Sequence, residues 1–173
     1  MRVSVISVGY VDTDILVTIV EAVEQDIPGT EANKIPEIVS MPPDAYSSTR
    51  NQYDSRKILD KLLDYSKFRN TQSLLGVTNE DLFTPGMNFI FGQAMPRTGI
   101  AVISINRLRY GLDVNFVRDL FLDRVSKEAF HELGHLMGLR RCPDPNCVMH
   151  FSNTLGDTDS KSTQFCKRCS SKI

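Results

Sequence analysis

The chain has 173 residues, of which 41% are hydrophobic and 24% are charged, and its formal net charge is −1. This length fits one globular domain with room for a small appended subdomain, and the composition excludes the disordered and membrane-spanning classes. The near-neutral charge gives no strongly basic face, so nucleic acid is not an expected partner. No run reaches the roughly 20 apolar residues of a transmembrane helix, and the N-terminal residues lack a signal-peptide pattern. We therefore expect a cytoplasmic protein with no membrane partner.

The first half of the chain predicts strands and helices in alternation. Residues 2–8 are apolar or small and rich in β-branched side chains, which is typical of a strand covered on both faces. A helix should follow, capped by Asp12 or Asp14. The pattern then predicts a second strand within 34–41, a polar loop over 44–54, a helix from Ser55 to about Phe68, and a strand at 74–78. This β-α-β-α-β order favours parallel strands with right-handed crossovers.

The second half predicts a hairpin, a long helix and an irregular tail. Strands at 88–94 and 100–105 have a short connection, which indicates an antiparallel pair and hence a mixed sheet. A long helix should run from a cap at Asp113 through Gly138. Its expected buried side carries Phe116, Val117, Leu120, Phe121, Val125, Ala129, Leu133, and Leu136 or Met137. We predict an α/β protein divided into residues 1–138 and a small C-terminal subdomain, 139–173.

Two of the three histidines lie four residues apart, with a glutamate beside the first. On a helix, His131 and His135 share one face and can present ring nitrogens to one cation, while Glu132 lies close enough to reach a water on that cation. Zinc would lower the pKa of this water toward about 7, and Glu132 would take its proton during attack on a peptide carbonyl. The alternative is a chance pair of histidines packed as polar core residues.

All four cysteines lie near the C-terminus, at Cys142, Cys147, Cys166 and Cys169. The two pairs are separated by four and two residues, within the range that tetrahedral zinc sites use. In a reducing compartment this cluster indicates a structural zinc site rather than two disulfides. Zinc binding would then supply folding energy to the tail.

The stretch around these residues resembles the archaemetzincins, a family of metzincin zinc metallopeptidases. The family motif runs His-Glu-x-x-His-x-x-Gly-x-x-His-Cys, then Cys-x-Met and Cys-x-x-Cys. The matching residues here are His131, Glu132, His135, Gly138, Cys142, Cys147, Met149, Cys166 and Cys169, and Arg141 stands in place of the third histidine.

The resemblance implies a twisted mixed sheet with backing helices, an active-site helix and a zinc-bound C-terminal subdomain. It also implies that Met149 forms the turn beneath the metal, and that the strand around 100–105 is the edge that aligns an extended substrate. Without the motif, Met149 is equally well explained as an ordinary core methionine.

The arginine raises the main question about the site. Its guanidinium has no lone pair to donate, so Arg141 cannot be a ligand, and its charge should lower metal affinity. One hypothesis has a partly occupied zinc on His131 and His135, with waters or another group, such as His150, completing the shell. Alternatively, Arg141 pairs with Glu132 or another acid in a metal-free cleft, or turns out to solvent.

These features are compatible with three alternative functions. The leading one is a zinc-dependent metallopeptidase acting on a peptide or protein substrate, with Glu132 as base. The second is a peptide- or protein-binding protein of the same fold with impaired catalysis. The third is a structural or nucleic-acid-interacting zinc protein, for which the tail offers positive charge at Lys161, Lys167, Arg168 and Lys172.

Overall fold

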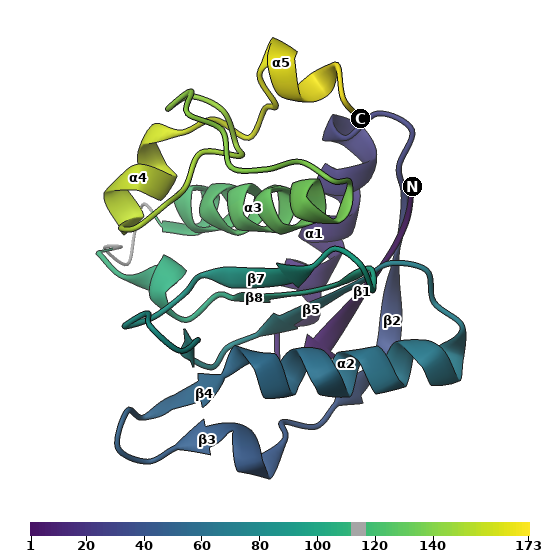
Figure 1. Cartoon of the computed structure of the whole chain (residues 1–173), viewed down its shortest axis with the longest axis vertical. Coiled ribbons are helices and arrows are strands. Elements are labelled where there is room, and N and C mark those ends of the chain that lie inside the picture. The colour runs from purple at the N-terminus through teal and green to yellow at the C-terminus, as the bar shows by residue number, and fades with distance from the viewer. Residues whose placement is uncertain (112–116) are drawn as a thin grey trace.

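A five-stranded mixed sheet forms the centre of the computed structural model, which describes residues 1–111 and 117–173 (Figure 1). The strand order is β2-β1-β5-β8-β7. Four strands are parallel, and β7 pairs with β8 in the antiparallel sense, as the short connection predicted. The strands are β1 (Arg2–Val8), β2 (Glu31–Val39), β5 (Leu74–Thr78), β7 (Gly92–Met95) and β8 (Ile100–Ser104).

Helices cover both faces of this sheet. Helices α1 (Thr13–Asp26) and α3 (Val117–Leu136) lie on one face and α2 (Ser55–Arg69) lies on the other (Figure 1). Asp54 caps α2 by accepting a hydrogen bond from the Arg56 backbone N–H, while Asp12 stands at the N-cap of α1 without such a bond. Each helical layer encloses its own cluster of buried apolar side chains against the sheet. The predicted α/β class is confirmed.

The predicted polar loop over 44–54 is partly wrong, because this segment contributes to a second, three-stranded sheet. Its strands are β3 (Tyr46–Ser47), β4 (Gln52–Asp54) and β6 (Leu82–Phe83), and single 3-10 turns occur at η1 (Pro43–Ala45) and η2 (Arg107–Arg109). Arg50 donates to the carbonyls of Met87 and Asn88, and Gln52 also donates to Asn88. Long-range polar contacts therefore order a segment that has no hydrophobic periodicity.

The predicted edge strand is also wrong. Strand β8 lies between β5 and β7, so both of its sides are hydrogen-bonded. The edge is β7, which begins at Gly92, later than the strand expected at 88–94. A hairpin leaves either of its strands free to pair further, and here the parallel pairing of β5 with β8 leaves β7 outermost.

Helix α3 lies against β7 and β8, and it carries His131, Glu132 and His135. Phe121, Val125, Ala129 and Leu133 are buried as predicted, whereas Leu120 is 38% exposed, contrary to prediction. The expected cap Asp113, Phe116 and the side chain of Val117 lie outside the described residues. None of the helices described is long and apolar enough to cross a membrane.

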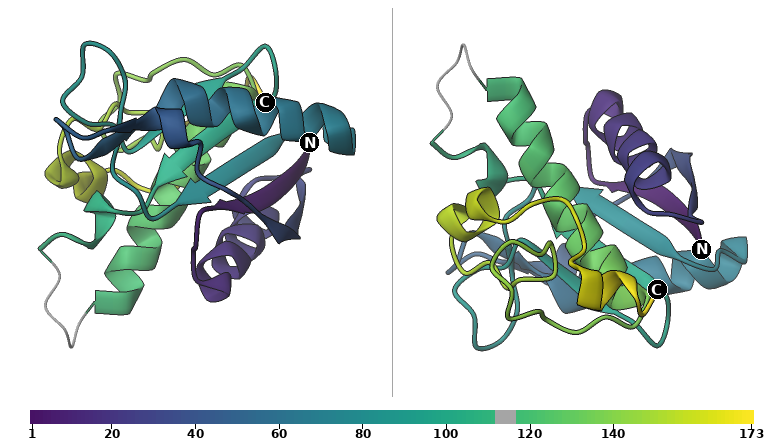
Figure 2. Two further views of the ribbon diagram at one scale, coloured as in Figure 1. Left: turned by 90° about the horizontal axis from the view of Figure 1, so that it is seen from below. Right: turned by 90° about the horizontal axis from the view of Figure 1, so that it is seen from above.

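The tail contains two short helices, α4 (Leu155–Ser160) and α5 (Lys167–Ser170). It returns over α3 on the side away from the sheet (Figure 2). A capping box between Thr154 and Asp157 begins α4. Several tail side chains share the buried cluster formed by α1, α3 and the sheet, among them Leu139, Cys142, Cys147, Val148, Met149 and Cys169.

Candidate active site and cysteine cluster

The two histidines present free nitrogens on one face of α3. The ring centroids of His131 and His135 lie 4.8 Å apart and the ring planes are nearly perpendicular, at 89°. The Nδ1 atom of His131 donates to the carbonyl of Val148 at 2.9 Å, and Nδ1 of His135 donates to the carbonyl of Leu139 at 2.8 Å. A neutral imidazole that donates through Nδ1 carries its lone pair on Nε2, the form that binds a metal.

Burial keeps both histidines in this neutral form. It lowers the pKa of His131 to about 4 and also lowers the pKa of His135. The positive charge of Arg141 further lowers the pKa of His135. Both rings can therefore act as neutral donors at pH 7 without first losing a proton.

The carbonyls that orient the histidines come from the turn that ends α3. Gly138 has φ +89°, a left-handed conformation that glycine adopts without strain. The N–H of Leu139 then bonds to the carbonyl of Gly134, and the N–H of Cys142 bonds to the carbonyl of Met149, each at 2.9 Å. This turn brings residues 139–149 back alongside the helix.

Met149 packs directly against the active-site helix. Its side chain is fully buried, and a Cβ atom at Gly134 would overlap its sulfur. Glycine between the two histidines therefore allows the methionine to approach the helix backbone. The structure thus places Met149 in the core beneath the turn of helix that carries His131 and His135.

Glu132 is buried beside the edge strand. Its side chain packs against Gly92 of β7, where a Cβ atom would lie 2.7 Å from Oε1. The residue is 4% exposed, and within residues 1–111 and 117–173 its Oε2 has no hydrogen-bond partner. Burial raises the pKa of this carboxyl group to about 8, and the charge of Glu128 adds to the effect. An orphaned carboxylate oxygen in the same cleft wall as two neutral histidines fits a site for a cation and a reacting group.

A cleft of about 390 Å³ joins these groups to the edge strand. Its walls include Gly92, Gln93 and Ala94 of β7, His131, Glu132 and His135 of α3, and Arg141, Phe151, Ser152 and Asn153 of the tail. No Asp, Glu, Cys or His among the described residues joins the histidine pair closely enough to be a third ligand.

Arg141 lies over an aromatic ring rather than against an acid. Its guanidinium carbon is 3.8 Å from the centroid of Phe151, a close cation–π contact. The predicted pairing with Glu132 is absent from the described ion pairs. Arg141 is exposed, as the solvent alternative predicted, yet it forms part of the cleft wall.

His150 is not brought to the histidine pair. Its Nδ1 donates to the carbonyl of Cys142 at 3.0 Å, and the residue is absent from the walls of the cleft. The structure therefore gives no support to His150 as a replacement ligand.

A buried ion pair below the cleft was not predicted. Lys161 donates to Oε1 of Glu128 at 3.0 Å, and Thr158 donates to the same oxygen at 3.3 Å. Lys161 is 2% exposed, so it was wrong to count it among the positive charges that the tail offers to a nucleic acid. Glu128 stands four residues before Glu132 on one helix face, a spacing that could have indicated it. No pattern in the sequence links Glu128 to its partner Lys161, which lies 33 residues further along the chain.

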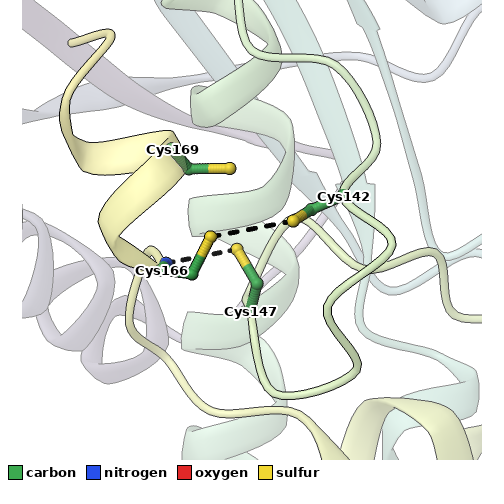
Figure 3. Close-up of side chains that lie close together, drawn as sticks. All are labelled: Cys142, Cys147, Cys166 and Cys169. Atoms are coloured by element: carbon green, nitrogen blue, oxygen red, sulfur yellow. Dashed lines mark hydrogen bonds between the residues drawn. The ribbon is translucent and has the colours of Figure 1, made fainter.

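The four cysteines converge, as the spacing predicted (Figure 3). Their sulfur atoms all lie within 4.8 Å of one another, and none forms a disulfide. Arg168 donates to the Cys142 sulfur at 3.2 Å, and the Cys166 backbone N–H donates to the Cys147 sulfur at 3.3 Å. A backbone hydrogen bond with Cys169 lowers the pKa of Cys166 to about 7. Four convergent sulfurs with N–H donors around them fit a tetrahedral zinc site.

A helix that presents two histidines and a glutamate beneath a sheet edge is the framework of the zinc metallopeptidases, and this is the class that the fold and cleft define. The sequence model of peptidase family M54 matches residues 6–173. The archaemetzincin of Pyrococcus furiosus is 47% identical over 132 residues, which cover 75% of this chain and 68% of that protein. The archaemetzincin of Saccharolobus solfataricus is 34% identical over 177 residues, covering 100% and 93%.

Solved structures agree with this result. The crystal structure of archaemetzincin from Archaeoglobus fulgidus complexed with malonate matches with a TM-score of 0.85 at 34% identity, and the match covers 100% of both chains. Archaemetzincin from Methanopyrus kandleri matches with a TM-score of 0.82 at 39% identity over 99% of this chain and 92% of that one. The chain belongs to peptidase family M54.

The buried ion pair gives the first prediction. Lys161→Met leaves the Glu128 carboxylate buried without its partner, so we expect the free energy of unfolding to fall by about 3–5 kcal/mol. The double variant Glu128→Leu/Lys161→Met should recover most of this loss, because a buried ion pair can be replaced by apolar side chains at little cost. Urea unfolding at fixed zinc concentration measures both, with the exposed Lys172→Met as control. A single-variant loss below about 1 kcal/mol would contradict the burial of this pair.

Proposed function

We propose that the chain is a zinc-dependent metallopeptidase in which His131 and His135 hold the catalytic zinc and Glu132 is the general base. The observation that carries the proposal is the convergence, in one cleft, of two Nε2 lone pairs and an unpaired carboxylate oxygen of Glu132. Membership of a zinc metallopeptidase family supports the same function.

Each group has a distinct task. Zinc, when bound, supplies a Lewis acid that polarises a peptide carbonyl and lowers the pKa of water. Glu132 takes the proton of the attacking water and returns it to the leaving amine. Without a metal, burial raises the pKa of Glu132 to about 8, and the positive charge of a bound zinc would lower it so that the carboxylate can act as a base at pH 7. The carbonyls of Val148 and Leu139 keep the imidazoles in the ligating tautomer.

We place the substrate along β7. This strand is the edge of the sheet, and three of its four residues line the cleft. An extended peptide can add to such an edge through main-chain hydrogen bonds. The scissile carbonyl would then lie between the edge strand and the histidine pair.

Arg141 should make the catalytic zinc weakly held. With arginine in the third ligand position, two protein nitrogens remain for the metal, and a fixed positive charge stands on the cleft wall. A peptide- or protein-binding role with impaired catalysis is therefore the second candidate function, and Arg141 is the observation that favours it.

We assign the cysteine cluster to a second, structural zinc. The four sulfurs leave no open position for a substrate, and the cluster joins residues 142–147 to α5. In this proposal residues 139–173 are a subdomain held by zinc against the 1–138 unit. That zinc also fixes the turn that supplies the carbonyls to both histidines.

The direct test of the enzyme is Glu132→Gln. Removing the base should lower the rate of peptide cleavage in the presence of zinc by about 10²–10⁴-fold. Cleavage is followed with a mixture of fluorogenic peptides, and the exposed Glu21→Gln is the control. Activity that is equal in the wild type and Glu132→Gln would point to a contaminating peptidase and contradict the assignment.

Restoring the histidine tests the effect of Arg141. After excess zinc is removed, the wild type should retain about one zinc per chain and Arg141→His about two, because imidazole adds a ligand and removes a charge. Peptidase activity should rise at least about tenfold, since even loss of an outer-shell partner costs roughly 10–100-fold. Arg140→His is the matched control. Two tightly held zinc ions in the wild type would refute this account of Arg141.

Loss of the cysteine zinc should loosen the tail selectively. In Cys147→Ser, we expect amides of 139–173 to exchange with solvent at least about tenfold faster, because the metal no longer contributes folding energy there. The amides of β1 and β5 should keep their protection. Hydrogen exchange with mass spectrometry measures both regions. Unchanged exchange of the tail would remove the structural role of the cluster.

A further inference from the structure

Arg141 supplies the accessible charge of the cleft. The two acids in the cleft wall, Glu128 and Glu132, are both buried, and Glu128 is already paired with Lys161. The guanidinium of Arg141, by contrast, is on an exposed residue. A ligand that enters the cleft therefore meets a positive charge that no buried acid cancels by direct contact.

No acidic side chain competes for this guanidinium. Across residues 1–111 and 117–173, no carboxylate is recorded within 4.0 Å of Arg141, although ten other ion pairs are present. Most arginines and lysines on a protein surface are simply solvated, and the ion pairs that they form there contribute little. An arginine held in the wall of a substrate cleft without an internal partner is different, since its donors stay available to a ligand.

The position of Arg141 is fixed from two sides. Its guanidinium lies 3.8 Å from the centre of the Phe151 ring, and the next residue, Cys142, is anchored by its backbone bond to Met149 and by the cysteine cluster. Next to Phe151, the hydroxyl of Ser152 lies in the cleft wall and has no hydrogen-bond partner among the described residues. The cleft wall thus contains both the Arg141 guanidinium, in contact with Phe151, and the unsatisfied hydroxyl of Ser152.

These features define the chemistry of the ligand. A guanidinium in contact with an aromatic ring can still present parallel N–H groups in the geometry that a carboxylate accepts. The proposed peptide along β7 can offer a carboxylate from its C-terminus or from an Asp or Glu side chain. Holding the donors in place beforehand reduces the entropy lost on binding.

We propose that Arg141 is a specificity-determining residue that binds a carboxylate of the peptide in the cleft. The arginine thus replaces a metal ligand with an anion-binding group, and the cleft selects peptides by their negative charge. This inference rests on the proposed peptide-binding function of the same cleft and names the class of substrate.

The test compares matched peptides on the full-length, zinc-loaded Glu132→Gln variant, which should bind peptides without cleaving them. The probes are the peptide Ala-Phe-Gly-Leu-Ala as its free acid, the same peptide as its C-terminal amide, and amides with Asp or Asn at each position in turn. Isothermal titration calorimetry should show binding at least about tenfold tighter for a carboxylate-bearing peptide than for its neutral counterpart. Preference for the free acid identifies the C-terminal carboxylate, and preference for one Asp amide identifies a side chain.

Adding Arg141→Gln should abolish this preference, Arg141→Lys should keep part of it as a point charge without the fork, and Arg140→Gln should leave it unchanged. Equal binding of charged and neutral peptides, or a preference that survives Arg141→Gln, would overturn the inference and leave the peptidase proposal standing. If no peptide binds and the wild type cleaves none, both proposals fail. The comparison of acid with amide needs no change at Arg141, so equal binding of the two would overturn the inference even if the arginine variants fold poorly.

Discussion

The Nδ1 atoms of His131 and His135 donate to two backbone carbonyls, of Val148 and Leu139, that belong to the tail rather than to the helix. These bonds set the tautomer and the orientation of both rings. The carbonyls are in place because Gly138 turns the chain back and because Cys142 and Cys147 hold the returning segment. The two sites are therefore mechanically linked, since a structural zinc on the cysteines would stabilise the backbone that aims the histidines.

Among the described residues, most buried charged side chains of α3 form ion pairs, and Glu132 at the cleft does not. Arg124 pairs with Asp159, Lys127 with Asp123, and Lys161 with Glu128. Within the described part of the chain, one oxygen of the Glu132 carboxyl group has no hydrogen-bond partner, and burial raises the pKa of the group to about 8. Stability alone gives no reason to keep such a group, whereas proton transfer does. In the proposed function, the positive charge of Arg141 would weaken binding of a cation in the cleft and strengthen binding of an anion.

Patterns over short stretches of sequence predicted the features that depend on neighbouring residues. The β1 strand, the Asp54-to-α2 region and the histidine helix follow from hydrophobic period, and the cysteine site follows from spacing. The second sheet was missed because Arg50 and Gln52 are ordered by carbonyls more than 35 residues away. The edge strand was misassigned because a hairpin pattern does not tell which strand pairs onward. Lys161 looked like surface charge because only the fold brings it to Glu128.

Zinc-edge anomalous diffraction tests the central claim most directly, because it locates each ion and measures its occupancy separately. From crystals grown with one equivalent of zinc, we expect one strong peak at the four cysteines. A second peak between His131 and His135 should appear only with excess zinc and grow with its concentration. The absence of a peak at the histidines at any zinc concentration would contradict the account, as would two peaks of equal strength at one equivalent.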